Sequence, residues 1–180
     1  GDMDISIIHT KPKNRPKINT ISVSIPRMRE VIKAISRAVE NNEQIFWVCP
    51  LVNDSEKLDL AAAETRQTYL NKFFPDNVAL VHGKMDSKQK EEALLKFSKN
   101  KKNILVSTTV IEVGIDIPNA TIMIIEHAER FGLAQLHQLR GRIGRGNKKS
   151  VCILLYDQKI GDIARERLKV MRETNNGFLI

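Results

Sequence analysis

Cysteine and histidine are scarce in this chain, and their placement argues against a disulfide or zinc scaffold. Of 180 residues only two are cysteines, Cys49 and Cys152. Both lie in apolar runs, which predicts buried thiols in a reducing compartment. The four histidines stand apart from the cysteines in the sequence, so no zinc site is expected. We therefore expect a fold that is held together by its own hydrophobic core.

Long apolar runs and a secretory leader are also missing. The longest apolar run covers residues 45–52, whereas about 20 residues are needed to cross a bilayer. The chain starts GDMDISIIH, with acidic residues where a secretory leader is basic. These features predict a cytoplasmic protein without a membrane partner.

Acidic residues are outnumbered, 21 against 29 lysines and arginines, which gives a formal net charge of +8. The excess lies mainly in residues 11–17, which prolines punctuate, and in residues 130–149, which hold six basic residues and no acid. Such an excess predicts either a polyanionic partner or a soluble basic surface. Hydrophobic residues at 42% and charged residues at 28% are typical of one globular domain.

Apolar strands alternate regularly with amphipathic helices along the chain. Segments such as 45–49 and 104–106 are apolar throughout, as strands buried on both faces of a parallel sheet are. The pattern predicts strands at 21–25, 45–49, 78–81, 104–106, 122–125 and 151–156, and helices at 26–40, 55–73, 87–97, 131–139 and 162–172. The first strand is expected to be half-buried, and the last helix to turn Ile163, Leu168 and Met171 inward. This alternation predicts an α/β fold with a mainly parallel central sheet.

The strongest motif is QLRGRIGRG at residues 138–146, in which three arginines are interspersed with glycines. Arginine presents planar, paired donors that suit phosphate oxygens, and glycine lets the backbone approach a ligand closely. The motif follows a predicted helix and precedes a buried strand. A phosphate-binding turn is one interpretation of it, and a solvated basic loop is the other.

A second motif, STTVIEVGIDIP, begins at Ser107, where a predicted strand ends. In α/β sheets ligands bind at this end of the strands. Thr108 and Thr109 carry hydroxyls that can bond phosphate oxygens. Gly114 permits close backbone approach, and Asp116 suits a ribose hydroxyl or a water. The alternative interpretation is a loop of turn-forming residues.

Two shorter segments follow other predicted strands. In VHGKMD, Gly83 and Lys84 suit contact with a nucleic-acid backbone, whereas His82 taken alone is more often a packed residue. Pro50 follows the strand at 45–49 and occupies a comparable place at the sheet edge. Simple termination of the strand is the alternative explanation for Pro50.

Two motifs of nucleotide-hydrolysing proteins are missing from the sequence. It holds no G-x-x-x-x-G-K-[ST] phosphate loop, because Gly83-Lys84 lacks the earlier glycine and the following hydroxyl. No Asp-Glu pair follows a buried strand, and the nearest acid is Glu126, beside His127. If the chain acts on a nucleotide, the phosphate cradle and the metal-binding acids must come from elsewhere.

Taken together, these motifs resemble the second motor domain of superfamily 2 helicases. STTVIEVGIDIP resembles helicase motif V and QLRGRIGR resembles motif VI, while IFWVCPL and VHGKMD occupy the places of motif IV and the segment after it. The longer run HAERFGLAQLHQLRGRIGRG and the tail ARERLKVMRETNNGF resemble the bacterial RecG family of branched-DNA helicases. The resemblance covers nearly the whole chain and is least specific in the basic arm at 11–17.

The resemblance implies a three-layer, RecA-like domain of the P-loop NTPase type, without a phosphate loop of its own. ATP with Mg²⁺ would bind mainly on a first RecA-like domain of the same chain. Arg142 and Arg145 would be arginine fingers that reach the γ-phosphate across the cleft. Gln138 would orient the nucleotide or couple it to nucleic acid, and Gly114 and Asp116 would line the cleft. The residues facing branched or duplex DNA would be His82, Gly83, Lys84, Thr108, Thr109 and Pro50.

The resemblance also predicts how the chain is organised. Residues 1–20 would be a linker or arm, 21–158 the RecA-like domain, and 159–180 the start of a helical hairpin. The apolar end at 178–180 predicts a fragment of a longer protein. Because it lacks a phosphate loop, the fragment is expected to have no ATPase activity by itself.

The parent protein would be a bacterial, nucleoid-associated helicase that reverses forks and migrates Holliday junctions in recombination and repair. Two alternatives stay open: a transcription-repair coupling factor, which shares FGLAQLHQLRGR, and a catalytically inactive nucleic-acid-binding module.

Overall fold

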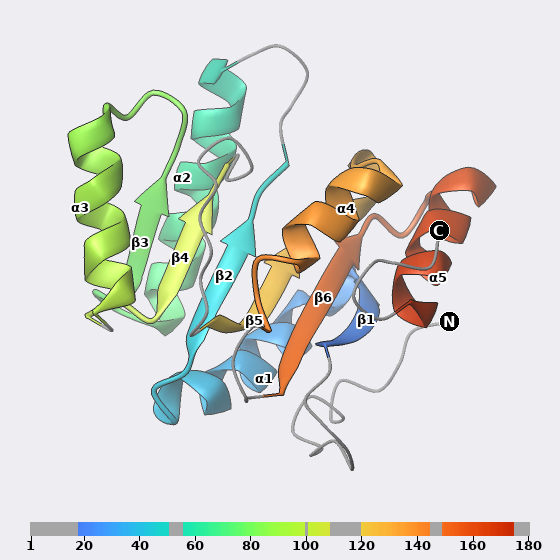
Figure 1. Cartoon of the computed structure of the whole chain (residues 1–180), viewed down its shortest axis with the longest axis horizontal. Helices are drawn as coiled ribbons and strands as arrows, with labels where there is room; N and C mark the ends of the chain where they lie inside the picture. The colour runs from blue at the N-terminus through green and yellow to red at the C-terminus, as the bar shows by residue number, and fades with distance from the viewer. Residues whose placement is uncertain (1–17, 51–55, 100, 109–119, 145–148, 175–180) are drawn as a thin grey trace.

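The computed structural model describes residues 18–50, 56–99, 101–108, 120–144 and 149–174, which form one six-stranded sheet with helices on both faces (Figure 1). The strands are β1 (Ile18–Ser24), β2 (Gln44–Val48), β3 (Val78–Val81), β4 (Ile104–Ser107), β5 (Ala120–Ile125) and β6 (Ser150–Tyr156). The helices are α1 (Met28–Glu40), α2 (Glu56–Phe73), α3 (Ser87–Ser98), α4 (Leu133–Arg140) and α5 (Asp162–Glu173), with 3₁₀ turns at Ile25–Arg27 and Ala128–Arg130. The strand order is β1-β6-β5-β2-β4-β3, and the described strands all pair in parallel. The predicted α/β class with a mainly parallel sheet is confirmed.

The helices form two layers, one on each face of the sheet. On one face, Ile35 of α1 and Leu70 of α2 belong to the same core as Trp47 of β2. On the other face, α3, α4 and α5 share a second core, in which Leu136 of α4 accompanies Phe46 of β2. Figure 1 shows α4 in front of the sheet, α1 behind it, and α5 next to β1. Successive residues of a strand point to opposite faces, so β2 needs the continuous apolar run that its sequence has.

The first strand differs from its prediction in both start and burial. β1 begins at Ile18, three residues earlier than predicted, and all seven of its residues pair with β6. Ile21 and Val23 face one core, whereas the alternating Thr20 and Ser22 are also buried, at 3% and 0% exposure. The half-buried prediction is therefore wrong. It fails because arginine side chains from distant helices cover these hydroxyls and satisfy them: Arg172 Nη1 donates to Ser22 Oγ at 2.6 Å.

The prediction that α5 turns Ile163 toward the core is also wrong. Ile163 is 78% exposed, whereas Leu168 and Met171 are 2% and 0% exposed. Leu168 and Met171 are three residues apart and so share a helix face. Ile163 precedes Leu168 by five residues, which places it about 140° around the helix from Leu168.

Because the strands are parallel, their ends gather at two opposite edges of the sheet. We call the edge where the strands end the carboxyl edge and the other one the amino edge. Backbone hydrogen bonds join neighbouring segments at the carboxyl edge: Cys49 N to Ser107 O (2.8 Å), Thr108 N to Val81 O (3.2 Å) and Glu126 N to Val48 O (2.9 Å). The first residues of three connecting segments, Cys49, Thr108 and Glu126, are therefore each bonded to the last residue of a neighbouring strand.

Both cysteines are free and buried, as predicted. Burial raises the pKa of both thiols, that of Cys152 to about 12, so each stays protonated at neutral pH. None of the helices in the described part of the chain is long and apolar enough to cross a lipid bilayer.

Candidate functional site

The arginine-glycine motif lies on α4 and on the turn that follows it. The buried side of this segment consists of Leu136, Leu139, Arg140 and Ile143. These positions recur every three or four residues, as on one face of a helix. The helical path continues past the last residue of α4, because Gly141 has φ −67° and Arg142 N donates to Leu139 O at 3.0 Å. By this periodicity, Arg140 lies on the buried side of the segment and Arg142 on its outer side.

Arg140 is the inner arginine, only 1% exposed. Its Nη1 donates to Thr20 Oγ1 at 3.1 Å and to the carbonyl oxygens of Met171 and Thr174, each at 2.7 Å. Its Nη2 lies 3.2 Å from Nδ1 of His137. Burial lowers the pKa of Arg140, and burial together with Arg140 lowers that of His137. Arg140 thus joins α4 to β1 and to the end of α5, a structural role that the sequence analysis missed.

Gln138 and Arg142 lie on the outer side of the same segment. They are four residues apart, so they share a helix face. Gln138 is exposed and Arg142 is half-buried. The outer side of this segment therefore carries an amide and a guanidinium, which are groups that suit an anionic ligand. Arg145 lies outside the described residues.

The turn after Arg142 reaches the amino edge of the sheet. Gly144 has φ +77°, a conformation that glycine adopts without strain. A side chain there would also collide with Ile18 at the start of β1, because an added Cβ would lie 2.7 Å from Ile18 Cγ1. It would lie 3.6 Å from Ser150 Oγ at the start of β6. Glycine is needed at this position for both reasons.

The loop after β3 is at the carboxyl edge. Gly83 and Lys84 are exposed, and His82 is half-buried. The backbone N–H of Lys84 donates to Nδ1 of His82 at 3.2 Å. Burial lowers the pKa of His82. The charge of Glu64 opposes this shift and those of Lys90 and Lys84 add to it, so the pKa is lowered overall and the ring is neutral at pH 7. His82 thereby shapes the loop that presents Gly83 and Lys84.

The neighbouring segments at the carboxyl edge bury their first side chains. Pro50 after β2 is buried, and Thr108 after β4 is 3% exposed. Ser107 is completely buried, and its hydroxyl has no hydrogen-bond partner among the described residues. Three of the other predicted site residues, Thr109, Gly114 and Asp116, lie outside the described residues.

The predicted site residues therefore fall into two groups on opposite edges of the sheet. Pro50, Thr108 and the loop at 82–84 lie at the carboxyl edge. The turn that carries Arg142 approaches the amino edge at the other end of α4. Helix α4 runs between these edges, because it connects the carboxyl end of β5 to the amino end of β6.

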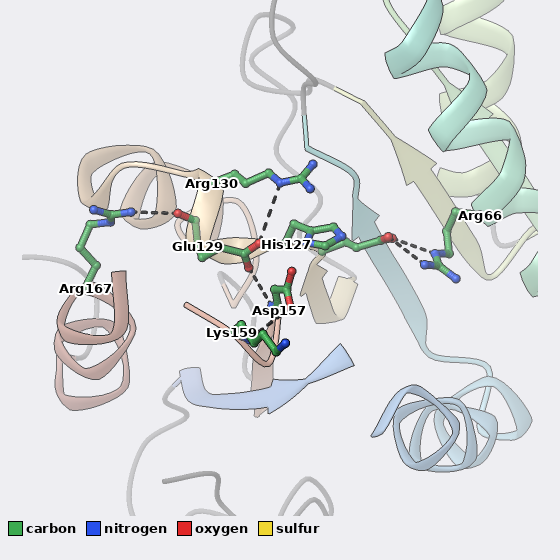
Figure 2. Close-up of polar contacts among 8 residues, drawn as sticks. Arg66, His127, Glu129, Arg130, Asp157, Lys159 and Arg167 are labelled. Atoms are coloured by element: carbon green, nitrogen blue, oxygen red, sulfur yellow. Dashed lines mark hydrogen bonds and ion pairs between the residues drawn. The ribbon is translucent and has the colours of Figure 1, made fainter. Parts of the chain in front are cut away.

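A buried ion pair at the carboxyl edge was missed by the sequence analysis. Glu126, the first residue after β5, accepts two hydrogen bonds from Arg66 of α2, each 2.8 Å long (Figure 2). It also accepts one from Trp47 Nε1 at 2.9 Å. In the sequence, Glu126 was the nearest candidate for a metal-binding acid. No local pattern connects it to an arginine 60 residues away.

A second carboxylate, Glu129, also lies in the connection from β5 to α4, and this residue bonds to the residue after β6 and to α5 (Figure 2). Its Oε2 lies 2.9 Å from Nδ1 of His127 and 3.9 Å from Nε of Arg130, and its Oε1 accepts from the Asp157 N–H at 3.1 Å. Its backbone oxygen accepts from Arg167 at 2.9 Å. Burial favours a higher pKa for Glu129, but these hydrogen bonds outweigh it and lower the pKa. Glu129 is therefore an ionised anchor for the segment leading into α4.

A parallel sheet with a layer of helices on each face is the RecA-like fold of helicase C-terminal domains. The chain belongs to the helicase conserved C-terminal domain family, which matches residues 27–147. In sequence it is 49% identical over 181 residues to the ATP-dependent DNA helicase RecG of Acidithiobacillus ferridurans, and 44% identical over 182 residues to that of Escherichia coli K12. Each alignment includes the whole of this chain and 26% of the relative, so the chain spans about a quarter of the length of these relatives. The resemblance to the RecG family is confirmed.

Solved structures agree with this family. A structure of RecG bound to a three-way DNA junction matches 93% of this chain and 22% of that chain, with a TM-score of 0.76 and 40% identity. The C-terminal domain of the DEAD-box protein Dbp5 matches 88% of this chain and 86% of its own, with a TM-score of 0.60 and 16% identity. The second likeness concerns the fold alone.

Proposed function

We propose that this chain is the second motor domain of an ATP-dependent helicase that remodels branched DNA. The observation that carries the proposal is the similarity of 44–49% over the whole chain to RecG helicases, together with the likeness to RecG on a three-way junction. The parent protein would reverse forks and migrate Holliday junctions in recombination and repair, in the bacterial cytoplasm. Branched or duplex DNA and the first RecA-like domain would be the partners of this chain.

Arg142 and Arg145 would be the arginine fingers in this proposal, and Gln138 would orient the nucleotide or couple it to DNA. The donor set fits a polyphosphate, because Gln138 and Arg142 share the outer face of one segment and residues 130–149 contain no acid. Bound ATP would supply the phosphoryl group whose developing charge the arginines stabilise. Gly114 and Asp116 would line the same cleft. Mg²⁺ would be held mainly by the first motor domain.

The carboxyl edge would face the DNA backbone through Pro50, His82, Gly83, Lys84, Thr108 and Thr109. Among these, Gly83 and Lys84 are exposed at the loop tip, where a phosphate can reach the ammonium of Lys84. The buried Pro50 and Thr108 would act mainly by shaping the edge. Separate edges for DNA and for the arginine turn would let one rigid domain respond to both ligands.

The test is Arg142→Ala in the full-length protein, with DNA-stimulated ATP turnover and DNA affinity measured side by side. Turnover should fall by about 10³-fold, the lower end of what arginine fingers contribute, while DNA affinity stays within about twofold. Arg29→Ala, which removes an exposed arginine from α1, is the matched control and should change neither quantity. Loss of DNA affinity with intact turnover would refute the role given to Arg142. The chain by itself should not turn over ATP.

A further inference from the structure

The carboxylate of Glu126 joins three segments of the chain, namely β2, α2 and the connection after β5 to which Glu126 belongs. Its Oε1 accepts from Trp47 Nε1 on β2 and from Arg66 Nε on α2, and its Oε2 accepts from Arg66 Nη2. Cys49 Sγ lies 3.9 Å from the same Oε1. All of these groups are at the carboxyl edge, where β2 and β5 end.

The partner guanidinium is held as firmly as the carboxylate. The Cζ of Arg66 lies 5.5 Å from the centre of the Trp47 ring and 5.1 Å from that of Tyr69, within the range of cation–π contact. The side chains of Arg66 and Glu126 are only 18% and 13% exposed. Burial opposes ionisation of both groups, but their mutual contact outweighs it, lowering the pKa of Glu126 and raising that of Arg66. Both groups are therefore ionised, and little of either side chain is exposed to solvent.

The pair lies where the segments after β2 and β5 leave the sheet. Trp47 lies in β2, three residues before Pro50 at the predicted DNA-facing edge. Glu126 begins the connection from β5 to α4, whose far end carries Arg142. The next residue, His127, has φ +52°, a left-handed conformation that is uncommon for a residue with a side chain and needs support from its surroundings. One carboxylate thus fixes the start of both segments against α2.

Stability alone does not explain such a pair. Replacing a buried ion pair by apolar residues of similar volume is often neutral or stabilising, whereas removing one partner is costly because a buried charge is left unpaired. Bidentate geometry instead fixes the relative orientation of the groups that it joins. We propose that Arg66 and Glu126 are positioning residues that hold the β2 and β5 ends in register, so that contact with DNA at the carboxyl edge is transmitted to α4 and its arginines. This inference rests on the proposed helicase function.

The experiment uses the full-length protein and compares ATP turnover with and without a saturating three-way DNA junction. The variants are Glu126→Gln, which keeps an acceptor for Trp47, and the double variant Arg66→Met/Glu126→Gln, which leaves no unpaired charge. Glu30→Gln is the matched control, because Glu30 of α1 makes a more exposed pair with Arg27 of the preceding 3₁₀ turn. The unfolding temperature of each variant is measured in parallel.

Both Glu126 variants should lower the stimulation by DNA on the order of tenfold or more, as expected when reacting groups are misplaced by a fraction of an ångström. The double variant should regain the unfolding temperature that Glu126→Gln loses, without regaining the stimulation. Recovery of both together would mean a purely structural pair and would overturn the inference, as would undiminished stimulation in Glu126→Gln. If the unaltered protein shows no DNA-stimulated turnover at all, the proposed function itself fails, which is a separate result.

Discussion

Arg140→Met should destabilise the domain by about 3 kcal/mol, although Arg140 belongs to a motif whose other arginines are proposed to act on ATP. The guanidinium of Arg140 is buried and bonds to Thr20, Met171 and Thr174. Met171 and Thr174 stand at the end of α5, where the last carbonyl groups of a helix lack partners within the helix. Arg140 supplies that partner, and its positive charge also complements the helix dipole.

The size of this loss of stability follows from comparing the methionine side chain with that of arginine. Its side chain fills much of the same space but has no donors, so the two buried carbonyls bonded at 2.7 Å lose their partner. Each unsatisfied buried acceptor costs about 1–3 kcal/mol, and part of this is offset because a guanidinium no longer has to be desolvated. At about 2–4 °C per kcal/mol for a domain of this size, the unfolding temperature should fall by roughly 6–12 °C.

Urea unfolding followed by tryptophan fluorescence measures this loss, because the single tryptophan, Trp47, is completely buried. Arg140→Lys should recover less than half of the loss, since one ammonium cannot reproduce the planar fork of arginine. Arg165→Met, at an exposed position of α5, should change stability by no more than about 0.5 kcal/mol. The reasoning is refuted if Arg140→Met unfolds within about 1 kcal/mol of the unaltered chain, or if lysine restores full stability.

Three further predictions concern stability and use the same unfolding assay. Ser107→Ala should be neutral or raise stability by up to about 1 kcal/mol, because the hydroxyl it removes is buried without a described partner, and a clear loss would contradict this. Gly144→Ala should cost about 2–4 kcal/mol, through its positive φ and the collision with Ile18, whereas Gly161→Ala, whose new Cβ meets nothing within 4 Å, should cost little. The pKa of Glu126 is lowered from its ordinary value of 4.5, so the stability it contributes is complete above that value and is lost as the pH falls through the lower folded pKa. Glu126→Gln should therefore flatten the dependence of stability on pH below about 5. If stability still falls as steeply below about pH 5 in this variant, the pair with Arg66 contributes little to the pH dependence.

The order of strands and helices could be predicted from the sequence because each element is marked by a local pattern. The apolar run of β2 and the stripe of α1 depend on neighbouring residues alone, and both elements form close to their predicted ranges. Asp86 and Gln89 likewise make the capping box that begins α3, with Gln89 N donating to Asp86 Oδ1 at 2.8 Å. Ile163 is in the first turn of α5, about 140° around the helix from Leu168, so its apolar side chain does not join the buried face.

The polar residues of the core were harder to predict. Thr20 and Ser22 alternate with apolar residues, which is typical of a strand with one solvated face, but arginines from α4 and α5 cover them. These arginines lie 120 and 150 residues away in the sequence. Arg140 was not distinguished in the sequence from the other arginines of its motif, because its charge favours the surface.

By itself, the sequence determined the class of fold, the family and the motifs, because these depend on periodicity and on residue types at short spacings. Tertiary structure alone decided which arginine of the motif is buried and which is on the outer face at the turn. It also placed the predicted DNA-facing loop and the arginine turn on opposite edges, and brought Arg66 onto Glu126. The physical reason is that burial and ion pairing are set by contacts between distant segments, which no local pattern records.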